Sequence, residues 1–166
     1  MNGLTMNDDG LPGARSAARI AAVQALYQME ISEEAADDIT AEFVEFRFGR
    51  ENEVTPGEPD AEFFSDIVHG VPARQQEIDK EIAKCLAKNW RLSRVDSLLR
   101  AIMRAGAYEI LARRDVPAKV VIDEYVSLTH IFEAEDGAPF INAALDKLAH
   151  LKRPEEFGGE APDDQF

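Results

Sequence analysis

DVPAKVVIDEYVSLTHIFEAEDGAPFINAALD, residues 115–146, is the stretch of sequence that decides the fold. Pro117 stands where a helix would begin, since its fixed φ and missing N–H suit the first helical position. An apolar stripe with the four-, three- and four-residue steps of a helix face follows at Val121, Tyr125, Leu128 and Phe132. The acidic turn 133–137 interrupts this pattern, and a second stripe follows at Phe140, Ile141, Ala144, Leu145 and Leu148. The stretch predicts two amphipathic helices joined by a charged turn.

The rest of the chain carries the same helical spacing and no strand-like alternation. Further helical segments are expected at residues 14–30, 33–48, 60–88 and 93–113. Ser32 is expected to cap the second of these through its side-chain oxygen. Gly70 and Pro72 are expected to break or kink the third. Gly106 lies inside the fourth, where glycine is unfavourable by about 1 kcal/mol relative to alanine, so it indicates a close helix approach. We therefore predict an all-α protein with about six to seven helices.

The composition limits the classes of protein to which the chain can belong. With 166 residues, of which 45% are hydrophobic, it can form one domain or two small subdomains that share a core. Its single cysteine, Cys85, excludes an internal disulfide, suits a reducing compartment and is expected to be a core or boundary thiol. No apolar run approaches the ~18 residues of a membrane span, and the N-terminus lacks the features of a signal peptide. We therefore expect a cytoplasmic protein without a membrane partner.

The charge of the chain is strongly negative but unevenly distributed. A net charge of -14 argues against simple nucleic-acid binding, because contacts with phosphate need lysine or arginine. Acids dominate residues 30–62 and the tail after Pro154, whereas bases outnumber acids between residues 74 and 104. The basic residues of that stretch are Arg74, Lys80, Lys84, Lys88, Arg91, Arg94, Arg100 and Arg104. A solvated helix face explains most of them, although a local basic face can still hold a phosphate.

No enzyme signature is present in the sequence. The chain lacks a Gly-rich phosphate loop, a Gly-x-Ser-x-Gly turn and paired Cys or His residues at metal-binding spacing. Its three histidines, His69, His130 and His150, lie far apart in the sequence, and His69 is interpreted as a packed or boundary side chain. We therefore predict no catalysis, no metal site and no cofactor.

Ordered motifs within the opening stretch are more specific than its periodicity. They are Asp-Val-Pro at 115–117, Lys119–Glu124, Glu135–Asp136, Phe140–Asn142 and Leu145–Asp146. Together they resemble the signature of the NusB transcription antitermination factor family. The departures, where the family usually has Asn, Ala, Lys and Gly, are Asp123, Thr129, His130 and Ala143. Residues 14–27, 63–71 and 99–109 also resemble family segments, so the resemblance reaches over most of the chain.

The resemblance implies a NusB-like fold of two small helical bundles packed together. The expected parts are a disordered tail at 1–13, an N-terminal helical subdomain at 14–90, a C-terminal helical subdomain at 91–151 and an acidic disordered tail at 152–166. Periodicity by itself predicts only the helices, so this grouping rests on the family.

Arginine and aromatic residues of the first helical segment suit single-stranded RNA. Arg15 and Arg19 are four residues apart and so project from one side of a helix. Ser16 lies next to them, and Tyr27 shares the same broad face. Two guanidiniums can hold phosphates, and an aromatic ring can stack on an unpaired base. Surface arginines at this spacing are common in helices, however, and Tyr27 is also compatible with a place in the core.

The resemblance favours the RNA interpretation, because the corresponding opening of the NusB family binds a single-stranded element called boxA in ribosomal RNA leaders. The site implied by matched positions is Arg15, Ser16, Arg19, Tyr27, Asp136, Phe140 and Asn142. Ser16 and Ala17 stand where many relatives have further arginines, so binding is expected to lean more on a partner.

Each residue type in this implied site has a distinct expected role. The two arginines would neutralise phosphates, and the two aromatic rings would stack on or flank bases. Asn142 would read a base edge or cap local structure, whereas Asp136 would repel phosphate and so limit affinity or tune specificity. Phe140 also opens the second apolar stripe, so a place in the core is equally compatible with its position.

The resemblance further implies a non-catalytic transcription antitermination factor. It would pair with NusE, a protein of the small ribosomal subunit, and bind boxA RNA of ribosomal RNA operons. It would then join RNA polymerase and other Nus factors. Leu99, Arg100 and Arg104 are candidates for the contact with the protein partner, and many relatives have an acid at the position of Leu99. A homodimer is left open, since a self-associating helix face has the same pattern as a core face.

Two other functions remain open at this stage. The first is an RNA-binding module that serves ribosomal RNA modification, which would need a separate catalytic partner because the chain has no room for a cofactor-binding sheet. The second is a helical protein–protein scaffold without an RNA role, which the acidic surface and the thinned arginines permit.

Overall fold

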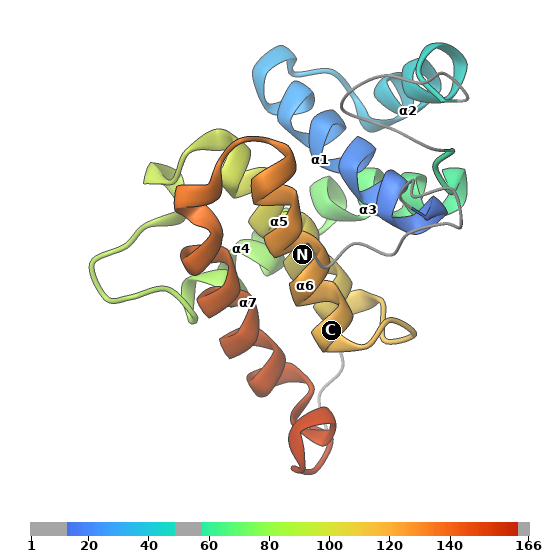
Figure 1. Ribbon diagram of the computed structural model, residues 1–166. Coiled ribbons are helices and arrows are strands. Elements are labelled where there is room, and N and C mark those ends of the chain that lie inside the picture. The colour runs from blue at the N-terminus through green and yellow to red at the C-terminus, as the bar shows by residue number, and fades with distance from the viewer. Residues whose placement is uncertain (1–12, 49–57, 163–166) are drawn as a thin grey trace.

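The computed structural model describes residues 13–48 and 58–162, and within these ranges the chain is all-helical, as predicted (Figure 1). The α-helices are α1 (Ala14–Ser32), α2 (Ala36–Phe46), α3 (Ala61–Ala73), α4 (Gln75–Ala83), α5 (Ser97–Ala112), α6 (Ala118–Ile131) and α7 (Ala138–Lys152). Short 3-10 helices are η1 (Leu92–Arg94), η2 (Glu135–Gly137) and η3 (Pro154–Phe157). Among the described helices, none is both long and apolar enough to cross a membrane.

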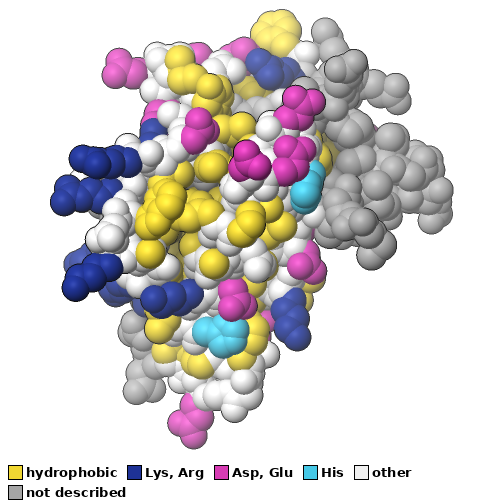
Figure 2. Space-filling view, turned by 60° about the vertical axis from the view of Figure 1, so that its left-hand side comes forward, with side chains coloured by type: hydrophobic (Ala, Val, Ile, Leu, Met, Phe, Trp, Pro, Cys, Tyr) yellow, Lys and Arg dark blue, Asp and Glu magenta, His cyan; other side chains and the backbone are white. Residues whose placement is uncertain are grey.

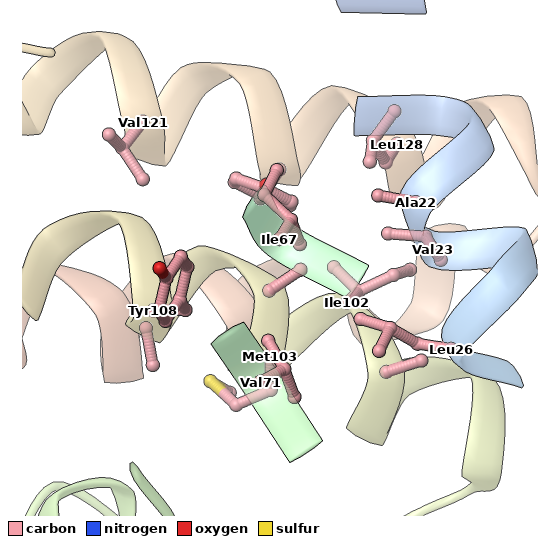
Figure 3. Close-up of a cluster of buried hydrophobic side chains, with 14 of the residues drawn as sticks. Ala22, Val23, Leu26, Ile67, Val71, Ile102, Met103, Tyr108, Val121 and Leu128 are labelled. Carbon is pink, nitrogen blue, oxygen red and sulfur yellow. The ribbon is translucent and has the colours of Figure 1, made fainter. Parts of the chain in front are cut away.

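Helix α5 lies at the centre of the molecule and joins its two groups of helices (Figure 1). On one side it packs against α1, α3 and α4, and on the other against α6 and α7. Apolar side chains from α1, α3, α5 and α6 meet in one continuous core, part of which is seen in Figure 3. The two bundles therefore share their interior, and the predicted division near residue 90 falls in the connection that contains η1.

Helix α1 is buried on nearly all sides over its first half. Every residue from Ser16 to Val23 is buried, because the small side chains there let α3 and α5 approach closely. These small residues are Ala17, Ala18, Ala21 and Ala22. A polar residue in this part of α1 therefore needs a partner inside the protein.

The helix ends follow local side-chain chemistry. The carboxylate of Asp60 accepts a 3.0 Å hydrogen bond from the Phe63 N–H at the start of α3, and Asp96 caps α5 in the same way. Ser32 does not cap α2, contrary to the prediction, because it is the last residue of α1 and its hydroxyl donates to the carbonyl of Gln28. Ala35 occupies the capping position of α2 without a side-chain bond.

Two glycines allow helices to come close together. A Cβ on Gly106 in α5 would lie 2.8 Å from a methyl carbon of Leu145 in α7, which confirms the predicted close approach. A Cβ on Gly70 in α3 would overlap the ring of Tyr108. Helix α3 then ends just after Pro72, which confirms the expected break.

The chain after residue 151 is more ordered than the sequence predicted. Lys152 completes α7 and η3 follows, because the fully buried guanidinium of Arg153 docks at the end of α5. It donates to the carbonyl oxygens of Glu109 and Arg113 at 2.8 Å and so supplies hydrogen bonds to acceptors at the C-terminal end of α5. The first 12 residues of the predicted N-terminal tail and residues 163–166 lie outside the described ranges.

Candidate nucleic-acid interface

Arg15 lies at the start of α1 with its guanidinium at the surface. Its side chain is 45% exposed and forms a 3.3 Å ion pair with the carboxylate of Asp115. The guanidinium also lies over the ring of Phe63, 4.6 Å from the centroid, which limits the directions in which it can point. Because the ion pair is solvent-exposed and therefore weak, a phosphate can compete with Asp115 for Arg15.

Arg113 lies beside Arg15, although the sequence did not single it out. Its guanidinium donates to both carboxylate oxygens of Asp115 at 3.0 Å and to Asp66 at 3.1 Å. Hydrogen bonding by Arg113 lowers the pKa of Asp115 to about 2, against a weaker opposing effect of desolvation. Arg113 also lies 4.8 Å from the Phe63 centroid, so the two arginines are held against one ring. Together they form a surface at which an anion can meet two guanidiniums.

Arg19 is not part of this surface, contrary to the sequence-based expectation. Its side chain is only 3% exposed, and it donates two hydrogen bonds of 2.8 and 2.9 Å to the carboxylate of Glu109. A third contact, of 3.5 Å, joins it to Glu124. Burial alone would lower the pKa of Arg19, but the bonds to Glu109 outweigh it and raise the pKa. The guanidinium is therefore permanently charged and inaccessible to a phosphate.

Ser16 belongs to the same buried network as Arg19. Its hydroxyl donates a 2.8 Å hydrogen bond to the carboxylate of Glu124, and the residue is 1% exposed. The hydroxyl of Tyr125 donates to Glu109, and burial raises the pKa of Tyr125 well above its usual value. These contacts join α1 to α5 and α6. Ser16 therefore stabilises the fold in this structure and does not reach RNA.

Tyr27 borders an open apolar groove between α1 and the ends of α5 and α6. The ring is 38% exposed, so it is neither sealed in the core nor isolated on the surface. The groove has a volume of about 460 Å³. Its lining residues are Gln24, Tyr27, Gln28, Ile31, Ser32, Arg47, Leu98 and Phe132. Such a lining suits the apolar side chains of a protein partner as well as a base.

The residues predicted from the last turn and helix lie together at the start of α7. Asp136 in η2 and Asn142 in α7 are exposed, and Phe140 is half-buried at the edge of the core. The ring of Phe140 lies 5.4 Å from that of Trp90, which comes from the loop before α5. Trp90 was missed in the sequence analysis, although it is the only tryptophan and stands in a basic stretch.

The three residues predicted to meet a protein partner are largely occupied within the chain. Arg104 donates two hydrogen bonds, of 2.8 and 2.9 Å, to Asp79. Arg100 forms an ion pair with Glu30 and donates a 2.7 Å bond to the carbonyl of Val95. The methyl groups of Leu99 pack against Gly137 in η2. Leu99 therefore packs against η2, and the preceding residue, Leu98, lines the groove beside Tyr27.

Titratable residues elsewhere in the described ranges form no group of three or more that could hold a metal ion. Cys85 is 8% exposed, and burial raises the pKa of its thiol, which confirms a boundary position. The Nδ1–H of His69 donates a 2.9 Å hydrogen bond to the Ser65 carbonyl, and its Nε2 lies 2.8 Å from a carboxylate oxygen of Asp37. It therefore links α3 to α2 as a boundary histidine.

Comparison with known proteins gives consistent matches. A sequence model of the NusB family matches residues 16–150. The transcription antitermination protein NusB of Rhodopseudomonas palustris (strain TIE-1) is 49% identical over 144 residues, which are 86% of this chain and 83% of that protein. The protein of the same name from Bradyrhizobium sp. (strain ORS 278) is 46% identical over 153 residues, covering 92% and 91%.

Solved structures agree with this match in their fold. NusB of T. maritima superposes with a TM-score of 0.70 at 26% identity and covers 89% of this chain and 99% of its own. A crystal structure of antitermination factors NusB and NusE in complex with dsRNA has a TM-score of 0.66 at 23% identity, covering 82% and 96%. At that identity the second likeness concerns the fold alone.

Proposed function

This chain belongs to the NusB family of transcription antitermination factors, which are RNA-binding proteins and not enzymes, and we propose that it binds boxA RNA of ribosomal RNA operons together with NusE. In this proposal it joins the RNA polymerase elongation complex with other Nus factors and suppresses premature termination. Its place of action is the cytoplasm, where the nascent RNA is made.

One observation carries the RNA part of the proposal: the exposed guanidinium of Arg15 lies beside Arg113 on an otherwise acidic chain. Two neighbouring arginines can bind adjacent phosphates of a single strand. The proposed site therefore keeps Arg15 and adds Arg113, and it omits the buried Ser16 and Arg19. At the start of α7 the proposed site keeps the exposed side chains of Asp136 and Asn142. It also keeps the half-buried ring of Phe140.

The groove beside Tyr27 supports a protein partner. It presents apolar atoms of Ile31, Leu98 and Phe132 to solvent without a described side chain that covers them. A protein that fills it would bury this surface and would also meet Tyr27, whose ring then contributes to the protein contact. We assign this groove to NusE, in line with the solved complex whose name includes NusB and NusE. RNA and NusE would then bind neighbouring parts of the chain and support each other.

Filter binding of the full chain to boxA-containing RNA and to a scrambled control tests the proposal. We expect boxA RNA to be retained preferentially, and more tightly when NusE is present. Arg15→Glu should weaken retention without changing the helical content measured by circular dichroism, because it places a negative charge where a phosphate would bind. Lys80→Glu makes the same change of charge on α4, which does not pack against α1, and should have little effect. Equal retention of both RNAs would disprove boxA recognition.

A further inference from the structure

The loop between α4 and α5 is the most basic exposed segment that the proposed site has not used. Residues 82–95 contain four cations and no acid. Lys88, Arg91 and Arg94 are exposed, and so is Trp90 between them. Figure 2, which brings the left-hand side of Figure 1 forward, shows Lys and Arg side chains along one edge of a hydrophobic patch. A concentration of exposed cations is unexpected on a chain with a net charge of -14.

Within the described ranges these three exposed cations have no acidic partner, as is true of Arg47, which instead donates to Gln28 and lies over the ring of Phe43. Across the ranges 13–48 and 58–162, no carboxylate forms an ion pair with Lys88, Arg91 or Arg94. Arginines that do pair with a carboxylate are Arg15, Arg19, Arg74, Arg100, Arg104, Arg113, Arg114 and Arg153. The loop therefore holds cations whose charge is not compensated locally, and a polyanion would complement them.

An aromatic pair stands at the same place. The ring of Trp90 lies 5.4 Å from that of Phe140 at an interplanar angle of 32°, which leaves room for neither a base nor a side chain between them. Trp90 is nevertheless 55% exposed, so its outer face is open to solvent. Phe140 packs against the indole and so restricts its orientation. A fixed ring with one open face is a stacking platform for an unpaired base.

We propose that this loop extends the RNA site from the start of α7, with Lys88, Arg91 and Arg94 bound to phosphates and Trp90 stacked on an unpaired base. The inference rests on the proposed function, since it supplies a further contact to the same single strand. An acidic protein segment would satisfy the cations but would leave the open face of Trp90 unused. Single-stranded RNA can bind the cations through its phosphates and the open face of Trp90 through a base. The contact of Trp90 with Phe140 places the loop next to the start of α7, where Asp136 and Asn142 lie.

Trp90 makes the proposal directly testable, because it is the only tryptophan of the chain. Its fluorescence reports on this loop and on no other part of the protein. Titration of the full chain with boxA RNA should change the emission saturably, with the Kd that filter binding gives. Oligoglutamate of similar charge should leave the emission unchanged, since it offers no base.

Substitutions separate stacking from charge. Trp90→Ala should weaken RNA binding at least about fivefold, which is the lower end for loss of one stacked base, and Trp90→Phe should largely restore it. The double change Arg91→Gln and Arg94→Gln should reduce the slope of log K against log salt by about 1.4, because each phosphate contact to a single strand contributes about 0.7. Arg74→Gln, at the opposite end of α4, is the matched control and should leave the Kd unchanged. Because Trp90 is 55% exposed, we expect its variants to keep the wild-type helical content, which circular dichroism checks.

The outcomes distinguish this inference from the proposed function. If boxA RNA is retained but neither the Trp90 emission nor the Kd of Trp90→Ala changes, the loop is not a contact and the proposed function stands. If oligoglutamate changes the emission as RNA does, the loop is a general site for acidic chains and base stacking is wrong. If the chain binds scrambled RNA as tightly as boxA RNA while Trp90 responds to both, the loop contact stands and boxA recognition fails.

Discussion

Arg19→Leu is expected to destabilise the fold strongly while leaving the RNA surface intact. The substitution places an apolar side chain in α1. It removes the cation from a network in which Glu109 and Glu124 are both fully buried. Two hydrogen bonds to Glu109, of 2.8 and 2.9 Å, are lost, and each bond to a charged group contributes roughly 1.5–3 kcal/mol. Removing one partner of a buried ion pair costs about 3–5 kcal/mol, which agrees with that sum.

The comparison with Glu124→Gln makes this prediction specific. The network has two carboxylates and one guanidinium, and Glu124 lies farther from Arg19, at 3.5 Å, than Glu109 does. Neutralising Glu124 therefore removes an excess negative charge and keeps the main ion pair. We expect its cost to be smaller than that of Arg19→Leu by at least about 2 kcal/mol.

Urea-induced unfolding followed by circular dichroism measures both variants. A loss of about 3–5 kcal/mol would be a large part of the free energy of unfolding of a typical domain, which is roughly 5–15 kcal/mol. If Arg19→Leu does not fold, Arg19→Lys keeps the charge and loses the two-pronged geometry, and should be intermediate. A loss below about 1 kcal/mol for Arg19→Leu, or equal losses for it and Glu124→Gln, would refute the reasoning. So would a folded Arg19 variant that binds boxA RNA as poorly as Arg15→Glu, because a buried guanidinium cannot contact phosphate.

Two further predictions concern Asp115 and Gly70. The pKa of Asp115 is lowered from 3.8 to about 2, so the stabilisation from its bonds to Arg113 is present above about pH 4 and is lost as the pH falls towards 2. Asp115→Asn should remove this part of the pH dependence of acid unfolding, and an unchanged pH dependence would contradict the stabilising role of Asp115. Filter binding should show a higher RNA affinity for this variant, because Arg15 loses its carboxylate partner. Gly70→Ala should lower the free energy of unfolding by about 1–3 kcal/mol, since the new methyl group overlaps the Tyr108 ring, whose hydroxyl is held by Asp66 at 2.7 Å. Thermal denaturation measures this change. If the free energy of unfolding instead rises by about 1 kcal/mol, as helix propensity alone would give, the Tyr108 ring moves freely out of the way.

The helices and their close contacts could be predicted from the sequence because they depend on local patterns. The stripes at Val121–Phe132 and Phe140–Leu148 correspond to α6 and α7, and the unfavourable Gly106 does mark a contact with Leu145. Such features depend on spacing and residue size, which the sequence states directly. The order of the segment after Lys152 was missed, because the docking of one arginine on distant carbonyls leaves no periodic signal.

The candidate site was only partly predictable, because spacing identifies a helix face without showing what covers it. Arg15 and Arg19 do share a side of α1, but that side meets α5 at Arg19 and solvent at Arg15. The partner of Arg19 is Glu109, 90 residues away, and nothing in the first helix indicates it. Only the run of small residues from Ala17 to Ala22 could have warned that this part of α1 is enclosed. Trp90, by contrast, was recognisable as an aromatic residue in a basic stretch, and only its contact with Phe140 needed the structure.

The distribution of compensated and uncompensated charge explains how an acidic chain of this kind can hold RNA. At physiological ionic strength the screening length is about 8 Å, so acids farther than this from a bound strand act on it weakly. What matters is the charge within that distance of each phosphate. Near Arg15 the acids Asp66 and Asp115 offset the two guanidiniums, whereas Lys88, Arg91 and Arg94 form no ion pair with a described carboxylate. Affinity should therefore depend more on the loop before α5 than on the start of α1, and a protein partner in the Tyr27 groove would supplement the weaker end of the site.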